Sequence, residues 1–184
     1  MRSVLVLVVA AVVAAWAIAH HLPEGQAAAE TQTVRAQEVQ SISFDGRELP
    51  TAALRDLITT RTGELVDARK LEHDRTMIQT ALEARGYLAV HVAPASVVFA
   101  SNGGAYVTFV IDLGLPFHVR SVTLTGASKR DAVLTISPGD IAVAERIERA
   151  RQAVADSIPS RGQVTVRMRT DVAASAVDLE LVVR

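Results

Sequence analysis

Residues 39–46 read VQSISFDG, and residues 119–126 read VRSVTLTG. Both stretches separate apolar residues by polar ones and then reach a glycine, a pattern typical of a half-buried β-strand that ends in a turn. The valine, the next two apolar residues and the glycine each lie 80 positions apart in the two stretches. The sequence therefore predicts that the same strand occurs twice.

Two further blocks of the sequence recur in the same order. Residues 63–86 match residues 139–162 at an offset of 76, beginning and ending on glycine. Residues 107–111 match residues 177–181 at an offset of 70, with apolar residues at alternate positions. Constant offsets within blocks, with small deletions between them, are what a duplicated fold with variable loops leaves behind. The chain is predicted to contain two tandem units of roughly 70–80 residues, each with its own small core.

The first unit predicts the order strand, helix, helix, strand, strand. Apolar residues alternate in the strands and recur at three- and four-residue spacing in the helices. Asp67 is a suitable N-cap for the second helix, and Gly63 and Gly86 are suitable helix ends. The strands are expected at 38–44, at 88–92 with an extension over 97–99, and at 107–111, and the helices at 50–62 and 68–85.

The second unit repeats this order. A capping-box-like pair, Ser128 and Asp131, precedes its first helix, and Pro159 closes its longer one. We predict an α+β fold of two tandem β-α-α-β-β domains, each a three-stranded mixed sheet with two helices packed on one face. In this unit the strands are expected at 119–124, 164–168 and 177–183, and the helices at 133–136 and 143–158.

The N-terminal segment is almost entirely apolar over residues 3–19, behind Arg2. Seventeen helical residues span about 26 Å, near the lower limit for crossing a membrane. The segment is expected to be either a cleaved secretory signal, with small-x-small sites at 17–19 and 27–29, or a retained anchor. Both alternatives export the remainder. The expected organisation is a signal peptide or membrane anchor over 1–19, a linker over 20–37, a first domain over 38–115 and a second over 116–184.

Composition and motifs argue against nucleic-acid binding and against catalysis. The formal net charge is −1, no run of five basic residues occurs, and no cysteine is present. The five histidines are scattered without the spacing of metal ligands. Asp67, Glu72 and Asp74 are interpreted as solvated charges on a helix face. No catalytic, cofactor-binding or metal-binding residue is predicted, and no cofactor is expected.

The order of elements and the glycine positions resemble the POTRA (polypeptide-transport-associated) domain family. The resemblance covers about residues 37–184, and the second unit departs from the pattern at Gln163, where the family prefers an aromatic residue. No barrel of the kind that usually follows such domains is expected within this sequence. The residues that carry the resemblance are Val39, Ile42, Phe44, Gly46, Gly63, Gly86, Tyr87, Gly114, Val119, Val122, Gly126, Gly139 and Gly162.

The resemblance implies a non-enzymatic protein-interaction module, a scaffold or chaperone, in outer-membrane protein assembly or secretion. It implies the periplasm of a Gram-negative-type cell, with or without an inner-membrane anchor through residues 3–19. The expected partners are an outer-membrane β-barrel component or extended client polypeptides. The alternative is a single-pass, membrane-tethered structural component of an envelope or division complex; an enzyme or small-ligand binder is the third possibility.

In this family the third strand of the sheet lies between the other two, which implies that the second strand is an edge. An edge strand has unpaired N–H and C=O groups and can accept an extended peptide as an added strand. Alternatively the edges are blunted, because Pro94 limits the first one, and Arg167 and Arg169 discourage pairing at the second. The candidate protein-binding residues are Leu88, Val90, Val92, Val164, Val166 and Met168.

Overall fold

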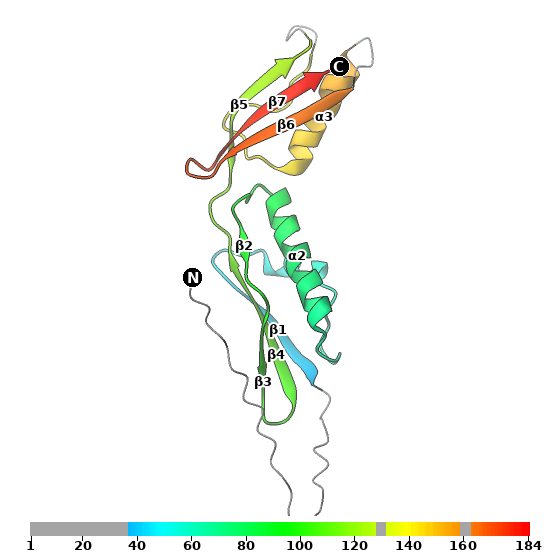
Figure 1. Ribbon diagram of the computed structural model, residues 1–184, viewed down its shortest axis with the longest axis vertical. Coiled ribbons are helices and arrows are strands. Elements are labelled where there is room, and N and C mark those ends of the chain that lie inside the picture. Colours follow the sequence, from blue (N-terminus) through cyan, green and yellow to red (C-terminus); the bar gives the residue numbers. More distant parts are fainter. Residues whose placement is uncertain (1–36, 128–131, 159–162) are drawn as a thin grey trace, which may run out of the picture. The chain divides into compact units, whose positions relative to one another are not determined.

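The computed structural model describes residues 37–127, 132–158 and 163–184 (Figure 1). Three sequence predictions lie outside these ranges: the apolar segment with its linker over 1–36, the capping pair Ser128 and Asp131, and the role of Pro159. Within the described part of the chain, no helix is long and apolar enough to cross a membrane.

The first sheet is built around its last strand. Strand β4 (Gly104–Asp112) pairs in parallel with β1 (Glu38–Asp45) and antiparallel with β2 (His91–Val92) and β3 (Ser96–Phe99). Figure 1 shows β4 between β1 and β3. The resemblance-based expectation that the last strand is central is therefore confirmed, and β2 and β3 are two segments of one edge.

Two helices accompany this sheet, α1 (Thr51–Leu57) and α2 (Ala68–Ala84). Helix α2 begins as predicted, because the Asp67 side chain accepts hydrogen bonds from the backbone N–H groups of Arg69 and Lys70. It ends at Ala84, and Gly86, two residues further on, has a φ of 98° in the left-handed region. The core between helices and sheet is aliphatic, apart from Phe109, whose ring lies 5.9 Å from that of Phe44.

The second sheet has the same strand order. Its central strand β7 (Ala176–Val183) pairs in parallel with β5 (His118–Thr125) and antiparallel with β6 (Val164–Asp171). The one helix assigned to the described part of this repeat is α3 (Ala144–Ser157). The register of the parallel pair shifts between Val39 and Ser41 in the first sheet and at the equivalent position, between Val119 and Ser121, in the second. The α+β class and mixed sheets of the sequence prediction are confirmed.

The glycine of the repeated strand motif is required by a close backbone approach. A Cβ atom on Gly46 would lie 2.3 Å from the carbonyl oxygen of Ile111, and one on Gly126 would lie 2.2 Å from that of Val183. Real Cβ atoms do not come so close to another atom. The glycine therefore permits the chain to leave the first strand past the end of the central strand in both repeats.

Two predicted element boundaries and one predicted helix are wrong. Helix α1 ends at Leu57, well before Gly63, which instead lies in a turn and donates to the carbonyl of Val39. The strand predicted over 88–92 is reduced to β2, because the N–H of Val90 donates to Tyr87 in a turn. Residues 132–137 are not helical, so the short helix predicted at 133–136 is absent from the described part of the second repeat.

Candidate protein-binding edges

Each sheet has two edges, β1 and the β2–β3 edge in the first and β5 and β6 in the second. The outer side of β1 is partly covered by the loop at 63–66, since Val39 N–H donates to Glu64 and Val66 N–H to Gln37. Strand β5 is covered in the same way at its start, where it forms a bridge between His118 and Ile141. The outer sides of β3 and β6 have no backbone partner among the described residues, whereas those of β1 and β5 are covered at their start.

The first-repeat residues predicted to form an edge do not lie in one exposed row. Leu88 is half-buried and packs against the core of the second repeat. Val90 precedes the strand and is buried, and Val92 lies in β2 with no exposed surface. Pro94 then interrupts the pairing, as the sequence indicated, so that β3 is the part of this edge that remains open.

The second-repeat residues predicted for the edge lie together on one strand. Val164, Val166 and Met168 are alternate residues of β6, which pairs with β7 without interruption from Val164 to Asp171. Their side chains face a groove between β6 and α3. The groove is lined by Ala144, Ile147, Glu148, Arg151, Val164, Thr165, Val166 and Met168.

The pairing of β6 also fixes where its backbone groups point. Gln163 and Arg184 exchange two hydrogen bonds, N–H to carbonyl in both directions. In an antiparallel pair such hydrogen-bonded residues alternate with residues whose N–H and C=O point away from the partner. By this alternation Val164, Val166 and Met168 direct their backbone groups outward, to the open edge. These three residues can thus form backbone hydrogen bonds with an added strand. Their apolar side chains can contact the side chains of that strand.

The outward faces of the two sheets differ in charge. Val98, Tyr106 and Val110 are exposed on the first sheet. The second carries ion pairs across its strands, among them Arg120 with Asp178 and Arg167 with Glu180. The Arg120 guanidinium, with a hydrogen bond from Ser121, lowers the pKa of Asp178 to about 2. The second face is held as an ionised network at neutral pH.

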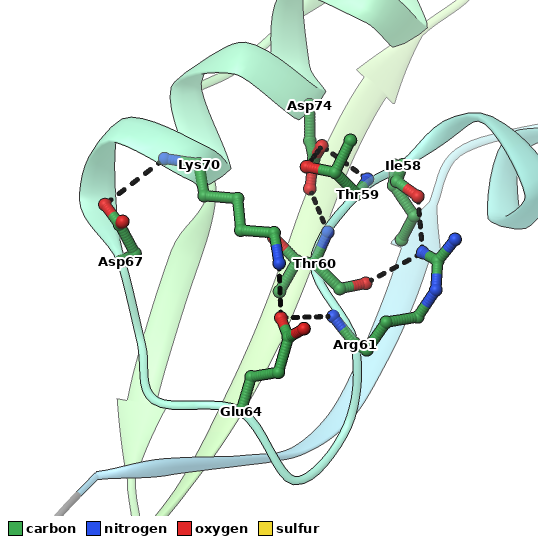
Figure 2. A network of polar contacts seen from close by, with 8 residues as sticks. All are labelled: Ile58, Thr59, Thr60, Arg61, Glu64, Asp67, Lys70 and Asp74. Carbon is green, nitrogen blue, oxygen red and sulfur yellow. Dashed lines mark hydrogen bonds and ion pairs between the residues drawn. The ribbon is translucent and has the colours of Figure 1, made fainter.

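One carboxylate interpreted as a solvated helix charge is buried. Asp74 on α2 has no exposed surface, and Figure 2 shows its carboxylate directed at the segment after α1. It accepts hydrogen bonds from Thr59 N (2.6 Å), Thr59 Oγ1 (2.7 Å) and Thr60 N (2.9 Å). Burial opposes the charge, but these hydrogen bonds outweigh it and lower the pKa of Asp74. The group fixes α2 to the end of α1, and its partners are backbone and hydroxyl donors, which indicates a structural role.

The described residues contain no cluster of three or more histidine, aspartate or glutamate side chains that could hold a metal ion. The arrangement therefore consists of sheet edges, a helix–strand groove and charged or apolar sheet faces. Unpaired backbone groups at a sheet edge and shallow apolar surfaces are features through which an extended peptide can be added as a strand.

Comparison with known proteins gives the family of the first repeat. Residues 37–114 match the family model POTRA, described as a surface antigen variable number repeat. This segment of the chain thus matches the family that the motif pattern of the sequence indicates. No curated protein matches the chain.

Solved structures extend the likeness of fold to both repeats. POTRA domains 3–5 of Haemophilus influenzae BamA match at a TM-score of 0.51 with 18% identity, covering 80% of this chain and 66% of that one. The periplasmic POTRA1-2 segment of Omp85 from Anabaena matches at 0.51 with 14% identity, covering 80% and 95%. Haemophilus ducreyi BamA lacking POTRA domains 1–3 matches at 0.52 with 18% identity, and this chain spans 29% of its length. Because each match covers more of this chain than either repeat contains, the likeness of fold includes residues of both repeats.

Proposed function

We propose that the chain is a non-enzymatic protein-interaction module of the periplasm that takes part in outer-membrane protein assembly or secretion. The POTRA match of residues 37–114 and the likeness in fold to the tandem domains of BamA and Omp85 support this proposal. The partner is an outer-membrane β-barrel component or an extended client polypeptide. In this proposal residues 38–115 and 116–184 act as two domains, exported by the apolar segment at 3–19.

The proposed mode of binding is addition of an extended strand to the edge at β6. The observation that carries it is the uninterrupted eight-residue β6, whose outer side remains unpaired in the described structure. A guest strand would exchange backbone hydrogen bonds with Val164, Val166 and Met168, which requires no particular guest sequence. Guest side chains on the groove side would contact Ile147 and the apolar side chains of β6. This chemistry favours a guest with apolar residues at alternate positions.

A proline substitution in β6 tests strand addition. The probe is an acetylated, amidated ten-residue peptide with valine at alternate positions and threonine or lysine between them, carrying a fluorophore. Val166→Pro removes an outward N–H without removing a hydrogen bond to β7, because proline is tolerated on the open side of an edge strand. We expect its affinity for the peptide, measured by fluorescence anisotropy, to fall about fivefold to tenfold, the effect of one lost hydrogen bond.

Val97→Pro is the matched control on β3, since the same alternation directs the Val97 N–H outward. It should leave binding at β6 unchanged. Thermal unfolding of both variants checks that each remains folded. Undiminished binding by folded Val166→Pro would contradict addition at β6.

A further inference from the structure

The long helices of the two repeats carry the same ion pair beside the sheet edge. Glu72 and Arg75 on α2 correspond to Glu148 and Arg151 on α3 at the repeat offset of 76. In both pairs the arginine Nε lies 2.9 Å from each oxygen of the glutamate. Each glutamate therefore holds Nε and Nη2 of its arginine and leaves Nη1 for a further acceptor.

In the first repeat this further acceptor is a backbone group of the edge. Arg75 Nη1 donates to the carbonyl oxygen of Val92, at 3.3 Å. The N–H of Ala93 donates to Val110 on the central strand. Because the C=O and N–H of a trans peptide point in opposite directions, the Val92 carbonyl points away from the sheet. The Arg75 guanidinium thus occupies the place where a strand added to β2 would lie.

A third residue of α2 keeps the arginine in this position. Arg75 Nη1 also donates to Gln79 Oε1, at 3.3 Å, and Gln79 in turn donates to Glu83. The second repeat has Ala155 where the first has Gln79, so this support is missing. Among the described residues, the hydrogen bonds of Arg151 go to Glu148 and Gln152, and none reaches β6.

The equivalent carbonyl of the second repeat lies on β6. The register of the sheets makes Val164 the equivalent of Val92, because Val92 pairs with Ile111 and Val164 pairs with Val183, which lie at corresponding positions of β4 and β7. The Val164 carbonyl also points outward, by the alternation along β6. Arg151 lines the groove next to it, with its Nη1 unoccupied by any described acceptor. The arginine thus binds the edge carbonyl in the first repeat, whereas in the described part of the second repeat the equivalent arginine does not.

We propose that Glu72, Arg75 and Gln79 close the β2 edge against strand addition, and that the alanine at 155 leaves the β6 edge open. The two repeats are thereby specialised, and an extended polypeptide with alternating apolar side chains is directed to the second repeat. This inference rests on the proposed function, because it assigns which edge the guest strand uses and which side chains decide it.

Transfer of the missing glutamine tests the proposal on the full chain. With the fluorescent valine peptide as probe, Ala155→Gln should bring Arg151 onto the Val164 carbonyl and weaken binding about tenfold, the effect of a charge-assisted hydrogen bond placed in competition with the guest. The double variant Ala155→Gln, Arg151→Ala should bind as the wild type does, because the glutamine then has no arginine to position. Restoration of binding separates edge closure from damage to the fold.

The reciprocal variant is Arg75→Ala, which should expose the Val92 backbone. Saturating peptide should then slow hydrogen exchange of the Val92 amide, which it does not contact in the wild type. Equal affinities of the wild type, Ala155→Gln and the double variant, or no new protection at Val92, would overturn the closure proposal while leaving strand addition intact. Failure of the peptide to bind the wild type and every variant would instead contradict the proposed function, and this inference with it.

Discussion

At the scale of single residues, a buried carboxylate decides how the first helix ends. Asp74 receives the N–H groups of Thr59 and Thr60, which would otherwise be unsatisfied next to the core. Sequence spacing indicated a solvated charge, because Asp74 lies among polar residues of α2. Its burial depends on the packing of α2 against a segment some 15 residues earlier, which no local pattern reports.

We expect Asp74→Ala to lower the free energy of unfolding by about 2–4 kcal/mol, because it leaves buried donors without an acceptor. Asp74→Asn retains one acceptor oxygen and should therefore lower the free energy of unfolding by less than Asp74→Ala does. Denaturant unfolding monitored by circular dichroism measures both. A loss below about 0.5 kcal/mol for the alanine variant would contradict the structural role assigned to the carboxylate.

The lowered pKa of Asp74 also predicts a pH dependence of stability. The folded-state pKa lies below that of the unfolded chain, about 3.9. The stabilisation is therefore present above about pH 4 and is lost as the pH falls through the folded-state value. We expect the wild type to lose more stability than Asp74→Asn between pH 5 and pH 2. Parallel stability curves for the two proteins would contradict this assignment.

Two glycines with similar backbone angles should respond differently to substitution. Gly126 and Gly139 have φ values of 86° and 94°, so alanine is strained at both. A Cβ on Gly126 would also strike the carbonyl of Val183, whereas one on Gly139 would meet nothing within 4 Å. We expect Gly139→Ala to lower the free energy of unfolding by about 1–2 kcal/mol. Gly126→Ala should lower it clearly more, and thermal unfolding measures both. Equal costs would show that the close approach does not constrain the motif glycine.

At the scale of elements, periodicity predicted most of the strands and the two long helices. It failed where backbone groups are satisfied by distant partners. The predicted strand over 88–92 is shortened by a turn at Tyr87–Val90, and helix α1 stops where Asp74 takes the next N–H groups. Residues 132–137 carry the apolar pattern of a helix, but in the structure they form no helical hydrogen bonds.

For the same reason, only the part of the candidate site in the second repeat could be predicted from the sequence. Val164, Val166 and Met168 follow from strict alternation, and the structure places all three on the open edge. The closure of the other edge was missed, because the contact between Arg75 and Val92 joins a helix to a strand 17 residues later. The repeat itself contained a usable signal: glutamate and arginine recur in both long helices, whereas glutamine at 79 becomes alanine at 155.

At the scale of the whole molecule, two repeats of one topology differ in their sheet edges. The first provides a matched POTRA domain with an interrupted edge, and the second provides a continuous edge beside an apolar groove. Their outward faces, apolar in one and ionised in the other, offer different surfaces to further partners. This division is compatible with a module that binds an extended client through one repeat and leaves the other free for a different contact.

Export of both repeats is the prediction at this scale. A β-lactamase fused after Arg184 should confer ampicillin resistance, because the enzyme protects the cell only from the periplasm. The matched control lacks residues 1–37 and should confer none. Sensitivity of cells that produce the intact fusion would contradict a periplasmic location for residues 38–184.

The central claim is that an extended polypeptide adds to β6, and amide hydrogen exchange resolved by residue tests it most directly. In the free chain, the amides of Val164, Val166 and Met168 point outward and should exchange faster than those of Thr165 and Arg167, which face β7. Saturating valine peptide should slow the three outward amides and abolish this alternation. If the alternation persists with the peptide bound, or if protection appears elsewhere on the chain, strand addition at β6 is wrong.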